Sequence, residues 1–326
     1  MPNKPVLFNV ALTLLVWLAW YCYSTPHTET IIKENWPITL TMVFGSFIAG
    51  ATSEGGGAVA FPVFTKLLHI APQDAKLFSL AIQSVGMTAA TLAIIVMRVV
   101  VAWRLILWVS LGGAVGVVCS SLLLAPLVEP ALLRMLFTAM ISSFALTLAI
   151  VSWQARQYHA QMPVFGKREQ GLMLLAGIIG GGMTGLVGTG IDIICFSVMV
   201  LLFRLSAKVS TPTSVVIMAV NSLVGFVLYL MVLGGFTARV ENYWLAAVPV
   251  VVVGAPFGAY CCTKMGNKAI TVLLITLIML EVASSLLLIP LTGTIIRVSL
   301  TVFTAFLFVY YWMSRSSHYR PVTMEK

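Results

Sequence analysis

The sequence predicts an all-α polytopic membrane protein with two inverted-topology five-limb repeats, broken or re-entrant helices, and one flanking helix at each end. Three observations carry this prediction: long apolar runs, an uneven distribution of basic residues, and glycine-rich breaks at matching places. Hydrophobic residues make up 60% of the 326 residues and charged residues only 9%. A soluble domain has about a quarter of its residues charged, so a large soluble domain is excluded.

Apolar runs long enough to cross a ~30 Å hydrocarbon core divide the chain. The predicted membrane-crossing helices are 6–23, 37–54, 75–97, 104–125, 131–151, 170–187, 208–234, 242–263, 268–288 and 294–313. Two shorter runs, 57–70 and 190–203, cannot cross alone at ~1.5 Å per residue. They are either short crossings or the return limbs of re-entrant hairpins. The first run lacks a small-x-small cleavage site, so we expect an uncleaved helix rather than a signal peptide.

Basic residues set the expected orientation. If the chain starts inside and every limb reverses direction, the inner ends hold 13 of the 19 Lys and Arg residues. The outer ends then hold the other six: Lys33, Lys66, Lys76, Arg134, Arg239 and Arg297. Because cytoplasmic loops carry an excess of Lys and Arg, we predict that both termini lie in the cytoplasm. The net charge of +9 then reflects these loops, and nucleic acid is not an expected partner.

The order long, break, short, long, long, long occurs twice, over 37–151 and 170–288. Each copy has an odd number of limbs, so the second enters the membrane from the opposite side and the repeat is inverted. The remaining segments are an N-terminal helix with an outer loop (1–36), a cytoplasmic linker (152–169), and a C-terminal helix with a cytoplasmic tail (289–326).

Glycines align between the two copies. A shift of 135 matches Gly55 with Gly190, and a shift of 142 matches Gly112 and Gly116 with Gly254 and Gly258. Small residues four apart allow membrane helices to approach closely. We therefore expect helix packing, rather than ligand binding, at the second set and at Gly177, Gly181 and Gly185.

A glycine-rich break interrupts each repeat. The first break is Ser53-Glu54-Gly55-Gly56-Gly57, and the second is Gly188-Thr189-Gly190-Ile191-Asp192. Glycine-rich backbone holds a helix poorly, and a broken helix in lipid leaves backbone polar groups without partners. The limb after each break begins with unpaired N–H groups, which suit an anion. In oppositely oriented repeats the two breaks can meet at the midplane and form the binding site of a transporter.

Carboxylates accompany both breaks. A carboxylate within a membrane is costly and points to a function, so Glu54 and Asp192 are the candidate groups for proton or ion coupling. The alternative is structural, with either side chain capping the N–H groups of the limb that follows. Glu281 lies in the middle of 268–288 with no basic residue at helical spacing. It is either a neutral group bonded to a hydroxyl or the partner of a residue on another helix.

Polar side chains in the limbs after the short runs are candidates for hydrogen bonds to an oxyanion: Gln83, Ser84, Ser214 and Asn221. The alternative is interhelical bonding, worth ~1 kcal/mol or less each. Charged residues near the mouths either steer anions or anchor the protein at the interface: Lys66, His69, Asp74, Lys76, Arg204 and Lys208.

Enzymatic and metal-binding signals are weak. The four histidines are scattered, without metal-ligand spacing, and the odd number of cysteines argues against a disulfide framework. The sequence offers no nucleotide-binding loop and no arguable Ser/His/Asp arrangement. We therefore expect no enzyme activity, no metal and no cofactor.

At the breaks the sequence resembles the TauE/SafE sulfite exporter family (TSUP, the toluene sulfonate uptake permeases). Residues 49–62, AGATSEGGGAVAFP, match the family's glycine-rich pattern well, and residues 181–192, GGMTGLVGTGID, match it less well. Asp192 stands where a glycine is usual, and Ser197 stands where the aligned proline would fall. The resemblance covers about residues 37–290. It implies an inner-membrane carrier of sulfur-containing anions whose two breaks line the substrate site.

The sequence thus predicts a secondary transporter that moves sulfite, sulfoacetate or another organosulfonate by alternating access, coupled to protons. The predicted substrate-binding residues are Ser53, Gly55, Gly56, Gly57, Gln83, Ser84, Gly188, Thr189, Gly190, Ser214 and Asn221. The alternatives are a carrier of another small organic anion and an anion channel, which needs a continuous polar pore. The expected partners are the anion, a proton and the lipid bilayer, and the sequence is compatible with an oligomer.

Overall fold

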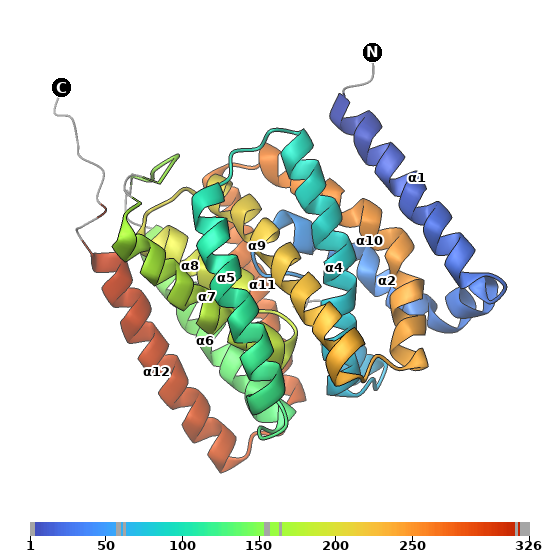
Figure 1. Cartoon of the computed structure of the whole chain (residues 1–326). Helices are drawn as coiled ribbons and strands as arrows, with labels where there is room; N and C mark the ends of the chain where they lie inside the picture. Colours follow the sequence, from blue (N-terminus) through green and yellow to red (C-terminus); the bar gives the residue numbers. More distant parts are fainter. Residues whose placement is uncertain are drawn as a thin grey trace.

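The computed structural model describes residues 4–56, 60, 63–152, 157–162, 165–316 and 319, which form a bundle of helices (Figure 1). The α-helices are α1 (Lys4–Ser24), α2 (Thr28–Ala51), α4 (Pro72–Val96), α5 (Trp103–Cys119), α6 (Pro130–Ser152), α7 (Lys167–Val187), α8 (Ile191–Ser197), α9 (Ala207–Leu228), α10 (Ala238–Lys264), α11 (Asn267–Leu288) and α12 (Gly293–Arg315). Four π-helical segments complete them: η1 (Val63–Leu67), η2 (Ser120–Leu124), η3 (Val198–Leu202) and η4 (Tyr229–Leu233). No strand forms among the described residues, so the all-α prediction is confirmed.

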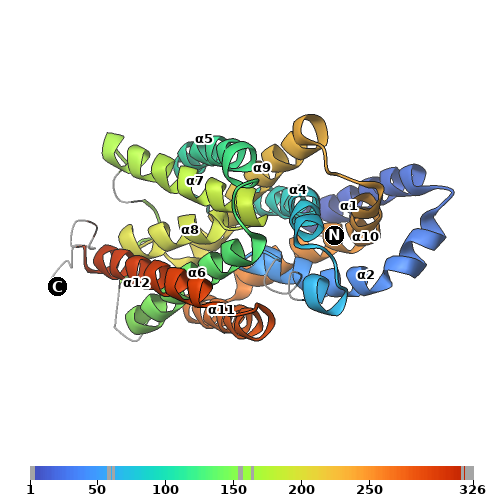
Figure 2. The same ribbon diagram turned by 90° about the horizontal axis from the view of Figure 1, so that it is seen from below.

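Nine helical stretches of the described chain are long and apolar enough to cross a membrane. They include α1 and α12, which lie at opposite edges of the bundle (Figures 1 and 2). The shorter apolar stretch Ile191–Leu202 contains α8, in which every residue is buried. The polytopic membrane class is therefore confirmed.

The helix α2 differs from the predicted span 37–54. It begins at Thr28, where an outer loop was expected, and ends at Ala51. At Asn35 the backbone leaves helical values (φ −114°, ψ 19°), two residues before Pro37. The part after this kink, 37–51, extends only ~22 Å at ~1.5 Å per residue, less than a ~30 Å core. Because its first half is also polar, α2 is not among the nine apolar stretches.

Two close helix pairs hold the bundle together: α2 packs on α10, and α7 packs on α5. A Cβ atom on Gly258 would lie 2.1 Å from the carbonyl oxygen of Phe47, and one on Gly112 would lie 2.1 Å from that of Leu174. No side chain fits in such a space, so the backbones touch directly. The packing role predicted for the aligned glycines is confirmed at Gly112, Gly116, Gly254 and Gly258.

The remaining long helices pack between and beside these pairs. The helices α4 and α9 pack against each other near the centre of the view in Figure 2. The helices α6 and α11 pack against each other, and α12 lies on α6. The described residues of the two breaks, 53–56 and 188–192, are all buried in this bundle.

The first helix, α1, is hydrogen-bonded to α10. The indole Nε1 of Trp20 donates to the carbonyl oxygen of Leu245 at 2.8 Å, and Nε1 of Trp17 donates to that of Pro249 at 2.9 Å. The carbonyl of Leu245 lies one turn before Pro249, which has no N–H to offer it. Trp20 therefore supplies the donor that the proline removes.

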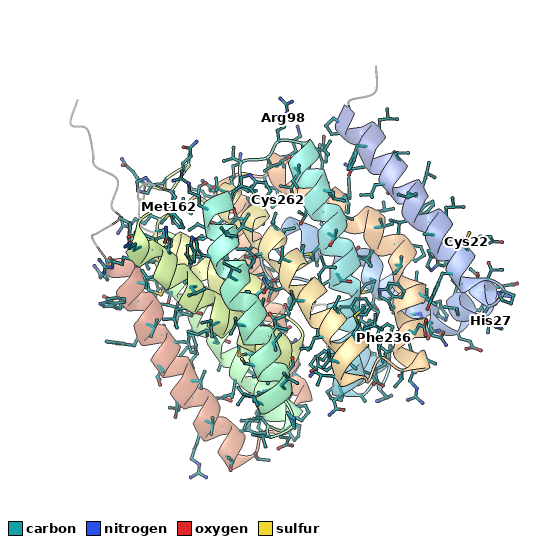
Figure 3. All side chains as sticks on the ribbon, viewed as in Figure 1. Cys22, His27, Arg98, Met162, Phe236 and Cys262 are labelled. Carbon is teal, nitrogen blue, oxygen red and sulfur yellow. The ribbon has the colours of Figure 1, made fainter. Side chains whose placement is uncertain are left out.

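The two ends of the bundle carry different residues. Arg98, Met162 and Cys262 lie at one end, where α1 begins and α12 ends, and His27 and Phe236 lie toward the other (Figures 1 and 3). We call these the Arg98 end and the His27 end. The chain thus starts and finishes its helical part at the same end of the bundle.

Candidate functional site

The first break follows the end of α2. Thr52, Ser53, Glu54, Gly55 and Gly56 are all buried, and Gly55 has a φ of +73°, which favours glycine. Neither carboxylate oxygen of Glu54 has a hydrogen-bond partner among the described residues, and the same holds for the Ser53 hydroxyl. Glu54 therefore caps no helix in the described chain. Gly57, also predicted to bind substrate, lies outside the described residues.

The second break joins α7 to α8. Gly188 and Gly190 have φ values of +90° and +134°. Oδ1 of Asp192 accepts hydrogen bonds from the backbone N–H groups of Gly190 (3.2 Å) and Ile193 (3.0 Å). The capping alternative is thus realised by one oxygen of Asp192. Its other oxygen, Oδ2, has no partner among the described residues.

The two breaks lie against each other. A Cβ atom on Gly55 would lie 3.1 Å from Oδ2 of Asp192 and 3.2 Å from the hydroxyl oxygen of Thr189. The helix α4 also holds the second break directly: Nε2 of Gln83 donates to the carbonyl oxygen of Gly188 at 3.0 Å. Residues from both halves of the sequence therefore form one site.

A narrow cavity of about 30 Å³ lies beside the breaks. Its polar lining comes from Ser46, Ser79, Gln83, Arg134 and Thr189, and Gly56 contributes backbone. Larger side chains complete an apolar wall: Met42, Phe64, Phe78, Ile82 and Met87. This volume holds about two or three water molecules, so the site is almost closed in this conformation.

Arg134 is the site residue that sequence analysis missed. It was counted only among the basic residues at the outer ends, but its side chain is 4% exposed and pairs with the carboxylate of Glu281. Its guanidinium carbon lies 5.6 Å from the centre of the Phe137 ring. The sequence feature that pointed to a buried cationic partner was Glu281, a carboxylate in the middle of an apolar run. The alternative that it pairs with another helix is correct.

Four ionisable side chains form one cluster at the breaks. Glu54 lies within Coulombic reach of Glu281, Asp192 and Arg134. All four residues are buried. The Glu281 and Glu54 carboxyl groups both act on the Arg134 guanidinium, in a medium that screens charge poorly. A change of charge at Glu54 therefore changes the energy of the other three.

Of the predicted site residues that the structure describes, Gly56, Gln83 and Thr189 line this cavity. Three of the others are held inside their own helices. Ser84 donates to the carbonyl oxygen of Ala81, and Ser214 donates to that of Thr211. Nδ2 of Asn221 donates to the carbonyl oxygen of Ile217, inside its own helix. Each is buried and bonds within its own helix.

Lys76 does not face a mouth as a free cation. Its Nζ donates to the hydroxyl of Tyr229 at 2.7 Å and to the carbonyl oxygen of Gly185 at 3.4 Å. It links α4 to η4 and to the end of α7. In the described part of the chain, no group of three or more His, Cys, Asp or Glu residues could hold a metal ion.

The fold and this site define a class of protein: a polytopic membrane protein in which broken helices from two halves bring charged groups to one internal cavity, as in secondary transporters. The family model described as "Sulfite exporter TauE/SafE" matches residues 38–285. The chain therefore belongs to the TauE/SafE sulfite exporter family, a family of membrane transporters rather than enzymes. No curated protein and no solved structure matches the chain.

Proposed function

We propose that this protein is a secondary transporter of a small sulfur-containing anion, namely sulfite, sulfoacetate or another organosulfonate. One observation carries the proposal: the two breaks lie against each other beside a cavity that Arg134 lines. A guanidinium and free backbone or hydroxyl donors are the groups that bind a sulfur oxyanion. The family membership supports the same class of substrate.

Two inverted repeats, 37–151 and 170–288, are the proposed architecture. The helix contacts support it, because the first limb of each half packs on the fourth limb of the other half: α2 on α10, and α7 on α5. The third limbs, α4 and α9, pack against each other, and so do the fifth limbs, α6 and α11. Such reciprocal pairing is expected of two halves related by a pseudo-two-fold axis.

Alternating access is the proposed mechanism. A second cavity of about 470 Å³ opens at the Arg98 end and reaches Gly50, one residue from the end of α2. Arg98 and Lys208 line it and would attract an anion. The positive-inside rule assigns this end to the cytoplasm of a bacterial-type inner membrane. Rocking of α2 against α10 would connect this cavity to the breaks.

Proton coupling is proposed at Glu54 and Asp192. Each has a buried carboxylate oxygen without a hydrogen-bond partner in the described chain. A proton on Glu54 would admit the anion, and an ionised Glu54 would expel it, since like charges repel strongly in a low-dielectric site. The proton would thus travel with the anion.

The test uses purified protein and proteoliposomes. We expect sulfite, sulfoacetate or taurine to raise the thermal unfolding midpoint more than carboxylate analogues do, because bound ligand stabilises the folded state. Flux should saturate and show counter-transport, with protein-free liposomes as the control. Flux that neither saturates nor shows counter-transport indicates a channel. The absence of any shift with all of these anions contradicts the proposed substrate class.

A further inference from the structure

The buried ion pair between Arg134 and Glu281 borders the candidate site; Arg134 is proposed above to bind the anion, but no role has been assigned to Glu281. Arg134 lies in the first turns of α6 and Glu281 in α11, and their side chains are 4% and 1% exposed. The edge of the Phe137 ring, which lies under Arg134, would be 3.3 Å from a Cβ on Gly190. The pair therefore joins the second break to α11.

Arg134 is the one cationic side chain among the described residues that line the narrow cavity. A guanidinium offers a planar fork of N–H donors that fits a carboxylate or another oxyanion equally well. The Glu281 carboxylate and a sulfur oxyanion therefore compete for the same donors. The hydroxyls of Ser53 and Thr189, which have no partner in the described chain, can serve the other oxygens of the anion.

Displacing Glu281 would leave a buried carboxylate without its cation, which is strongly unfavourable. Taking up a proton removes that charge. The groups that face Glu281 are Arg134 on α6 and, at longer range, Glu54 of the first break. Since neither break can supply a second cation, protonation is the remaining way to neutralise the displaced group.

We propose that a sulfur oxyanion binds by displacing the Glu281 carboxylate from Arg134, and that Glu281 then holds one proton for as long as the anion is bound. The charge balance closes: one negative charge and one proton enter, and the net charge of the cluster stays the same. Glu54 takes up the proton first, as proposed above, and Glu281 then holds it while the anion is bound. This inference rests on the proposed function.

Asp192 is less suited to this exchange. Its Oδ1 accepts two backbone hydrogen bonds at the start of α8. Losing them would remove the cap of a fully buried helix. Glu281 caps no helix end, because it lies inside α11, where the backbone N–H and C=O groups bond to one another.

The test measures sulfite binding and proton uptake by purified protein in weakly buffered solution. We expect wild-type protein to take up about one proton for each anion bound. Glu281→Gln should bind sulfite at least as tightly but take up no proton, because no carboxylate competes for Arg134. The double variant R134Q/E281Q should bind sulfite at least ~100-fold more weakly, because the guanidinium is gone.

A matched control changes a polar contact between the same two helices. Thr138 donates to Ser285 at 2.9 Å, four residues along each helix from the ion pair. The variant T138V/S285A should keep both sulfite affinity and proton uptake. The double variant R134Q/E281Q carries no buried charge at these positions, so it should keep a measurable unfolding transition.

Two results overturn the inference alone: folded R134Q/E281Q that binds sulfite within threefold of wild type, or Glu281→Gln that still takes up the proton. Proton uptake by Glu281→Gln overturns the inference even if the double variant does not fold. A wild-type protein that binds neither sulfite nor sulfoacetate overturns the proposed function as well.

Discussion

Gly55 and Asp192, one from each break, lie against each other: a Cβ on Gly55 would stand 3.1 Å from Oδ2 of Asp192. The contact joins residues from opposite halves of the chain. It also means that the first break can carry no side chain at this position without moving the second. The geometry of the site is therefore shared between the two halves.

Gly55→Ala should reduce anion flux at least tenfold. The new Cβ presses on Asp192 and Thr189, and a φ of +73° costs a non-glycine residue ~1–3 kcal/mol. Flux into proteoliposomes and the thermal unfolding midpoint are the measurements. The control is Gly182→Ala, where a Cβ has no neighbour within 4 Å. Equal flux in both variants would show that the contact between the breaks does not matter for transport.

Glu54→Gln should abolish the pH dependence of flux while the protein still folds. The amide cannot exchange a proton, yet it has nearly the same size and occupies the same buried position. Flux measured between pH 5 and pH 8 in proteoliposomes tests this. Glu129→Gln, at an exposed position, is the control and should keep the wild-type profile. An unchanged profile in Glu54→Gln would rule out proton loading at this residue.

Gly258→Ala should destabilise the protein by ~1–3 kcal/mol, the usual cost of overpacking. Its Cβ would lie 2.1 Å from the carbonyl oxygen of Phe47 and 3.0 Å from the backbone nitrogen of Ala51, where α2 ends. The new contact forces α2 away from α10 just before the first break, so flux should fall as well. Gly171→Ala meets nothing within 4 Å and is the control. A wild-type unfolding midpoint in Gly258→Ala would contradict the close approach of the two helices.

Tyr319→Phe should lower stability by ~1.5–3 kcal/mol, the value of a hydrogen bond to a charged group. The Tyr319 hydroxyl donates to Oε1 of Glu169 at 2.5 Å. Burial and this hydrogen bond raise the pKa of Tyr319 to about 12. Because the pKa is raised on folding, the contribution is complete below ~pH 10, the unfolded value, and is lost as pH rises through about 12.

The unfolding midpoint of Tyr319→Phe at pH 7 and pH 8 checks this prediction, and the loss should be equal at both. Tyr260→Phe, which changes an exposed tyrosine on α10, is the control. A loss that varies between pH 7 and pH 8 would mean that another group controls the contact.

The membrane class and the positions of the breaks followed from the sequence. A span must be ~20 apolar residues long in lipid, so helices such as α9 and α10 can be located from composition alone. Glycines at Gly55, Gly188 and Gly190 mark backbone that a helix cannot adopt, and all three have positive φ. The aligned glycines on α5 and α10 likewise showed where helices touch. These signals are local, because each depends only on the residue and its neighbours along the chain.

The composition of the site was decided by tertiary structure. Arg134 lies near the start of its helix, so its position along the chain indicated the outer interface, yet packing of α6 on α11 brings it to Glu281. Ser84, Ser214 and Asn221 have suitable side chains but bond to carbonyl oxygens of their own helices. The partner of a buried polar group is supplied by helices that are distant in sequence. The free-energy cost of leaving such a group unpaired arises only once those helices have packed around it.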